Sequence, residues 1–159
     1  MIKSLYIKNF ALIDELEVHF GDKLNILTGQ TGAGKSIIIG ALNMILGERA
    51  DTDVIRYGTD KAIAEATLKI SPNREIDQLL FENEIETNDF LILRREIRET
   101  GSRAFINDNP VNIRILKMLG DLLVDLHGQH DHQFLLKEEN HRGLIDSFET
   151  VQPVLNMYQ

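Results

Sequence analysis

Cysteine is absent from the 159 residues, which excludes disulfides and thiolate-bound metal sites. Hydrophobic runs are also short. None approaches the roughly 18 residues that span a bilayer, and the first ten residues lack the apolar core of a signal peptide. We therefore expect a cytoplasmic protein without a membrane partner. Positive charge is scarce, with 17 Lys and Arg against 25 Asp and Glu and a net charge of −8. Contact with nucleic acid would therefore need a local patch or other parts of a longer protein.

The strongest motif lies within residues 24–47. Leu24, Ile26 and Leu27 form a short apolar run that predicts a buried strand. Residues 37–46 then form an apolar segment of helix length, and Gly47 stands where a helix C-terminus favours a left-handed residue. The loop between them matches G-x-x-x-x-G-K-[ST] at every fixed position: Gly29, Gln30, Thr31, Gly32, Ala33, Gly34, Lys35 and Ser36.

The chemistry of phosphate binding explains these residue types. Glycines let the backbone wrap closely around a phosphate chain, and the loop amides and the helix N-terminus supply positive partial charge. Lys35 can reach the β- and γ-phosphates, and the Ser36 hydroxyl can bind the Mg²⁺ that bridges them. A glycine-rich turn that merely joins a strand to a helix is the alternative. The flanking segments favour a site for a nucleoside triphosphate with Mg²⁺, and the residues alone do not distinguish ATP from GTP.

Hydrophobic periodicity indicates further elements. Residues 4–20 predict a β-hairpin, residues 62–70 and 90–97 predict strands, and residues 105–106 lie on the probable partner of the latter strand. Residues 75–83 and 113–120 have helical spacing, and residues 122–126 are apolar enough for a buried strand. The segment 48–60 is polar and irregular and carries Arg49 and Arg56. Arg56 is a candidate for reaching the γ-phosphate or DNA, with a surface role as its alternative.

Two other functional interpretations remain open on the residues alone. Asp125 could end a Walker B strand, which would make the chain a complete small P-loop NTPase such as a nucleotide kinase. No acid follows Asp125 to activate water, and no lid-like arginine cluster follows either. A non-enzymatic interaction module is the third possibility, and it requires that the loop bind no nucleotide.

Two clusters of side chains have a functional and a structural interpretation. His127, His130 and His132 could bind a metal, but their spacing matches no zinc pattern, and a polar loop near the nucleotide is the favoured interpretation. In such a loop Gln129 or Gln133 could hold the metal or the attacking water. The local excess of positive charge comprises Arg94, Arg95, Arg98 and Arg103. If these arginines share one face of a hairpin they could contact a nucleic-acid backbone, and a solvated hairpin edge is the favoured alternative.

Several segments together resemble the N-terminal part of the RecN family of bacterial DNA-repair proteins, which are related to the SMC-type ABC ATPases. The matching stretches are LYIKNFALIDELEVHF, LNILTGQTGAGKSIIIGALNMILGERAD, GSRAFINDNPVN and LLVDLHGQHDHQFLL. The phosphate loop alone is generic. NFALIDELE near the start and HGQHDHQ about a hundred residues later make the resemblance specific.

The resemblance implies an α/β P-loop fold, the N-terminal lobe of an ABC-ATPase head, with a mixed sheet and an antiparallel hairpin layer. Residues 1–136 would form this lobe, and residues 137–159 would be the helical root of a truncated coiled-coil arm. The implied partners are the C-terminal half of the same head, a second copy that dimerises on ATP, and DNA in the full-length protein. No signature motif and no Walker B segment is present, so the chain alone should be inactive.

The resemblance also assigns roles to residues. Lys35 and Gln129 would be catalytic, with Gln129 as the Q-loop glutamine, and Ser36 and Gln129 would bind the metal. Asp125 would then be a strand residue before the Q-loop and not a Walker B acid. The expected nucleotide-binding set comprises Gly29, Gln30, Thr31, Gly32, Ala33, Gly34, Lys35, Ser36, Ile37 and Arg56.

Overall fold

The structure is a computed structural model and describes residues 1–29, 34–86 and 88–124. Residues 1–124 belong to one compact unit. The strands are β1 (Ile2–Phe10), β2 (Ile13–His19), β3 (Lys61–Lys69), β4 (Phe90–Arg98), β5 (Gly101–Ile106) and β6 (Asn109–Val111). The helices are α1 (Lys35–Ile45), α2 (Arg74–Glu82) and α3 (Ile113–Leu123), and a 3-10 turn, η1, spans Thr52–Val54.

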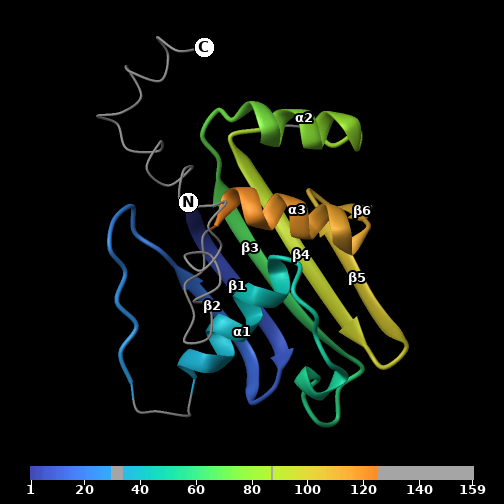
Figure 1. Cartoon of the computed structure of the whole chain (residues 1–159). Coiled ribbons are helices and arrows are strands. Elements are labelled where there is room, and N and C mark those ends of the chain that lie inside the picture. The colour runs from blue at the N-terminus through green and yellow to red at the C-terminus, as the bar shows by residue number, and fades with distance from the viewer. Residues whose placement is uncertain (30–33, 87, 125–159) are drawn as a thin grey trace, which may run out of the picture. The chain divides into compact units, whose positions relative to one another are not determined.

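The six strands form one sheet in the order β2-β1-β3-β4-β5-β6 (Figure 1). The hairpin predicted at residues 4–20 is confirmed as β1 and β2, and the strands predicted at 62–70 and 90–97 are confirmed as β3 and β4. Where a mixed sheet is expected, every strand pair among the described residues is antiparallel. No parallel strand pair, as a mixed sheet would require, is present among the described residues.

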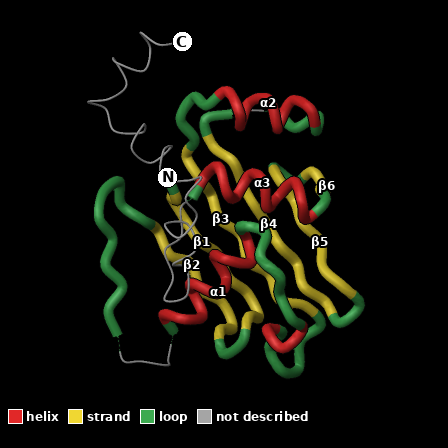
Figure 2. Tube along the Cα trace, in the orientation of Figure 1, coloured by secondary structure: helices red, strands yellow, loops and turns green. Residues whose placement is uncertain are grey.

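One face of the sheet carries the core, and α1 and α3 lie over that face (Figure 2). Side chains alternate between the two faces of a strand, so strand register determines which residues are buried together. The row Leu5–Ala66–Leu93–Ile106 runs across four strands and is almost wholly buried. On β3 the buried positions beneath α1 are small, namely Ala62, Ala64 and Ala66, which allows the helix to lie close to the sheet.

Two glycines let α1 and α3 pack backbone to backbone. Gly47 has the left-handed conformation predicted for it, with φ of 95°. A Cβ at Gly47 would lie 2.5 Å from the Cα of Lys117, and a Cβ at Gly120 would lie 2.5 Å from the carbonyl oxygen of Leu46. The sequence predicts that the helix beginning at residue 113 ends at Gly120. In the structure Gly120 lies inside that helix, α3. The helix continues to Leu123, and the absence of a side chain at Gly120 permits the close contact with Leu46.

Two strand predictions are wrong for this structure. Leu122 and Leu123, expected in a buried strand at 122–126, form the last turn of α3. Leu24, Ile26 and Leu27 form no strand, and their side chains are 84%, 74% and 46% exposed. A buried strand needs hydrogen-bonded neighbours, and no described residue pairs with this segment. The domain boundary expected after residue 136 lies outside the described residues.

Candidate nucleotide-binding site

The described ends of the phosphate loop are joined by a lysine. The ammonium of Lys35, the first residue of α1, donates a hydrogen bond to the carbonyl oxygen of Gly29. The ammonium group of Lys35 therefore lies close to Gly29, the first residue of the phosphate-loop motif. Gln30, Thr31, Gly32 and Ala33 of the expected set lie outside the described residues. Gly34 is the N-cap residue of α1.

The N-terminus of α1 has the properties of an anion-binding helix end. The first amide groups of a helix have no intrahelical acceptor and carry positive partial charge. Most helices satisfy such amides with a side-chain cap, yet Gly34 has none to offer and the first turn of α1 contains no acidic residue. By contrast, the side chain of Asn73 caps α2 by accepting hydrogen bonds from the amides of Glu75 and Ile76. The end of α1 is therefore suited to a phosphate group, and this observation fits ATP.

A cleft of about 530 Å³ lies beside this helix end. Ser36 and Ile37 from the first turn of α1 line it, together with Gly40, Asn43 and Met44 further along the helix. The opposite wall comes from Phe10 and from residues of the segment after α1, including Arg49, Asp51 and Asp53. The Ser36 hydroxyl thus lies where a polar ligand or a hydrated metal ion could reach it.

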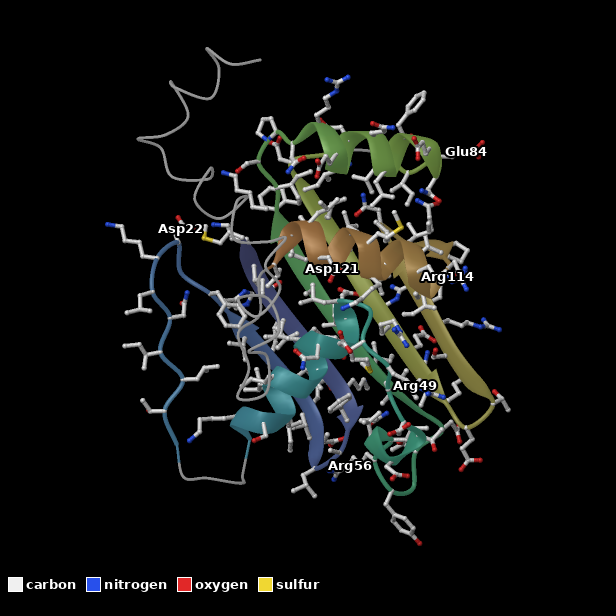
Figure 3. All side chains as sticks on the ribbon, in the orientation of Figure 1. Asp22, Arg49, Arg56, Glu84, Arg114 and Asp121 are labelled. Atoms are coloured by element: carbon white, nitrogen blue, oxygen red, sulfur yellow. The ribbon has the colours of Figure 1, made fainter. Side chains whose placement is uncertain are left out.

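The two arginines after α1 have different surroundings, and Figure 3 labels both on the segment between α1 and β3. Arg56, the arginine expected at the nucleotide, donates from Nη1 to the carbonyl oxygen of Leu12 at 2.8 Å. It is not among the residues that line the cleft, whereas Arg49 is. The sequence patterns predict no functional role for Arg49. Its position two residues after Gly47, and therefore close to the end of α1, is the signal that could have identified it.

Arg56 belongs to a clip that holds the β1–β2 turn. Its backbone amide donates to the carbonyl oxygen of Asn9 at 3.0 Å, and the amide of Ala11 donates to Val54 at 2.7 Å. Asn9 and Ala11 both have positive φ, of 52° and 49°, which is costly for residues other than glycine. The clip places Phe10, which lines the cleft, against the segment that carries Arg49.

The four arginines of β4 and β5 do not share one face. Arg94 lies on the open face of the sheet, where it forms ion pairs with Glu65 and Asp108 and stacks over the ring of Phe105 at 4.6 Å. Arg95 points to the opposite face and is only 2% exposed. Arg98 pairs with Glu96, which also binds Lys61. Paired carboxylates thus offset much of the positive charge on the open face.

Other expected features lie outside this site. Gln129 and the histidines at 127, 130 and 132 fall outside the described residues, as does Asp125. Among residues 1–29, 34–86 and 88–124, no group of three His, Cys, Asp or Glu side chains could hold a metal ion. A larger hollow of about 1180 Å³ adjoins α2 and the loop at 84–88, but none of its lining residues belongs to the phosphate loop. No helix in the described part is long and apolar enough to cross a membrane.

Comparison with protein families and with curated proteins gives consistent matches. A family model described as an AAA domain matches residues 4–150. The DNA repair protein RecN of Bacillus subtilis (strain 168) is 41% identical over the whole chain, and the DNA repair protein RecN of Vibrio cholerae is 41% identical over 93% of it. The chain spans 28% of the first protein's length and 27% of the second's.

Several solved structures of SMC and RecF proteins have a similar fold. A structure described as the structural biochemistry of ATP-driven dimerization and DNA stimulated activation of SMC ATPases covers 97% of this chain and 96% of its own, with a TM-score of 0.62 at 16% identity. The Smc head bound to the C-winged helix domain of ScpA covers 74% of this chain and 39% of its own, with a TM-score of 0.60 at 19% identity. RecF with ATP covers 70% of this chain and 27% of its own, with a TM-score of 0.54 at 11% identity. These likenesses confirm the fold class predicted from the sequence, an α/β P-loop ATPase head.

Proposed function

Because the chain belongs to the RecN family of DNA repair proteins, we propose that it is the ATP-binding N-terminal lobe of an ATPase head that acts in double-strand-break repair and recombination. The observation that carries this proposal is the complete phosphate-loop motif at residues 29–36 followed directly by the uncapped N-terminus of α1. The loop amides would bind the phosphates, and Lys35 would lie against the β- and γ-phosphates. Ser36 and Gln129 would hold Mg²⁺, which supplies electrostatic stabilisation of the phosphate charge when bound.

The remainder of the head is the first proposed partner. Leu24, Ile26 and Leu27 expose their side chains and lie in a segment without strand neighbours in the described part. Exposed apolar surface of this kind marks an interaction site. Strands from the C-terminal half would pair with residues 24–29 and bury them, which would also fix the start of the phosphate loop. The same half would supply the signature motif and the Walker B acid that this sequence lacks.

A second copy and DNA are the other proposed partners. Two heads would close on two ATP molecules, with each nucleotide held between one phosphate loop and the other head's signature motif. ATP would favour the closed state because it would contact both surfaces at once. Hydrolysis would reopen the heads, in the cytoplasm and at the nucleoid, and coiled-coil arms rooted near residues 137–159 would connect the heads to bound DNA.

Joining the chain to the C-terminal remainder of its head tests this function. We expect negligible ATP turnover by the chain alone, measurable turnover by the joined head, and faster turnover when double-stranded DNA is added. Lys35→Ala in the joined head is the control and should abolish turnover. Rapid hydrolysis by the chain alone would contradict the proposal, because it would require a complete catalytic site within these residues, with Asp125 as the Walker B acid.

A further inference from the structure

Arg95 is the one buried charged side chain in the described part of the chain. In the register of the sheet it stands between Ala64 of β3 and Ala104 of β5, and these small neighbours leave room for a guanidinium among apolar residues. No described carboxylate forms an ion pair with it, and burial alone lowers the pKa of its guanidinium from the usual value. Burying an unpaired charge is costly, so the buried position of Arg95 needs an explanation.

The contacts of Arg95 join two elements. Nη1 donates to the carbonyl oxygen of Met44 at 3.4 Å, and Nη2 donates to the Ser102 hydroxyl at 3.1 Å. Met44 belongs to the last turn of α1, whose carbonyl groups carry negative partial charge and which contains no basic residue of its own. Ser102 lies on β5, just after the turn from β4. The guanidinium thus connects the C-terminal end of α1 to the β4–β5 hairpin.

The surroundings of α1 explain why such an anchor matters. The helix rests on the small side chains of Ala62, Ala64 and Ala66. Its C-terminal end meets α3 at Gly47 and Gly120, and the hydrogen bond from Arg95 adds a link from that same end to the sheet. Its eleven residues span about 16 Å, and a helix of this length moves as a unit. A displacement at Met44 would therefore move Lys35 and Ser36 at the other end.

We propose that Arg95 is a positioning residue that sets the axial position of α1 and so couples nucleotide binding at Lys35 and Ser36 to the β4–β5 hairpin. This inference rests on the proposed nucleotide site. Coupling between two sites is reciprocal, so a nucleotide that orders α1 also orders the hairpin, and loss of the anchor weakens both effects equally. Nucleotide binding thereby changes the order of the β4–β5 hairpin, although no residue of this hairpin belongs to the phosphate loop.

Calorimetry with Mg-ATP and amide hydrogen exchange with and without ATP test the coupling in the chain. In the unsubstituted chain, ATP slows exchange at the amides of Gly101–Ile106. Arg95→Met removes the charge while keeping a long side chain, and we expect roughly tenfold weaker ATP binding, within the usual range for coupled sites. ATP should also no longer slow exchange in the hairpin. Arg94→Met on the opposite face is the matched control, with ATP affinity within about twofold of the unsubstituted chain.

Two further variants keep the charge in case Arg95→Met does not fold. Arg95→Lys still reaches toward Met44 and should keep ATP affinity within about threefold. Ser102→Ala breaks only the hairpin side, and we expect it to weaken the exchange response and the ATP affinity together, because the coupling is reciprocal. The inference is overturned if folded Arg95→Met or folded Ser102→Ala keeps both the affinity and the exchange response. Absence of ATP binding by the unsubstituted chain would instead refute the proposed function from which the inference starts.

Discussion

Gly120→Ala is expected to lower the free energy of unfolding by about 2 kcal/mol, because overpacking a close contact typically costs 1–3 kcal/mol. The added Cβ would lie 2.5 Å from the carbonyl oxygen of Leu46 and 3.1 Å from its Cα. These are backbone atoms at the end of α1, so no side-chain rotation can relieve the clash. The helices α1 and α3 would have to separate. Thermal unfolding should fall by roughly 4–8 °C for a chain of this size.

Gly40→Ala is the matched control for this contact. Gly40 also lies within a helix, but a Cβ there would meet no atom within 4 Å. Alanine favours the helix over glycine, so this variant should gain about 0.5–1 kcal/mol. Urea unfolding of both variants without nucleotide provides the measurement. Equal effects of the same sign would show that α1 and α3 do not meet through Gly120.

Lys35→Ala is expected to remove most of the stabilisation that ATP confers on the chain. A ligand at a hundred times its dissociation constant stabilises the folded state by about 2.7 kcal/mol, which corresponds to a rise in melting temperature of roughly 8 °C. Lys35 supplies the side-chain positive charge nearest the loop, and its ammonium already bonds the carbonyl oxygen of Gly29. Its loss should reduce the rise to about 2 °C or less at the same ATP concentration.

Lys23→Ala serves as the control for the charge itself. Lys23 is an exposed lysine that precedes the same loop, and it lies outside the residues 29–36. Differential scanning calorimetry with and without Mg-ATP should give the full shift for this variant. If Lys23→Ala and Lys35→Ala lost the shift equally, ATP would be acting through net charge rather than through the phosphate loop.

Local patterns predicted many of the strands because the alternation of apolar and polar residues within each strand reports which side chains are buried. The alternation at 62–70 and 90–97 determined which face of β3 and β4 is buried. The same alternation places Arg95 at a buried position with Leu93 and Ile97, a signal that grouping it with Arg94 by charge overlooked. Arginine is seldom buried without a partner, so composition and position gave conflicting indications.

Predictions from the sequence were wrong where the structure of a segment depends on contacts with residues far away in the chain. The apolar run at Leu24, Ile26 and Leu27 has the composition of a buried strand, but it remains exposed because strands need neighbours. Leu122 and Leu123 belong to α3, within which Gly120 allows contact with Leu46 of a distant segment. At the site, the motif predicts Lys35 and Ser36 as phosphate and metal residues, and this stays a prediction. The sequence predicts no role for Arg49 and places Arg56 at the nucleotide; the contact of Arg56 with Leu12 and the position of Arg49 in the cleft wall depend on segments far apart in the chain.

Isothermal titration of Mg-ATP into the chain tests most directly whether the loop at 29–36 binds a triphosphate. We predict saturable heat with one nucleotide per chain, and much smaller heat that does not reach saturation for Lys35→Ala under identical conditions. Absence of heat from the unsubstituted chain at millimolar Mg-ATP, with the chain shown to be folded, would contradict the nucleotide-binding function.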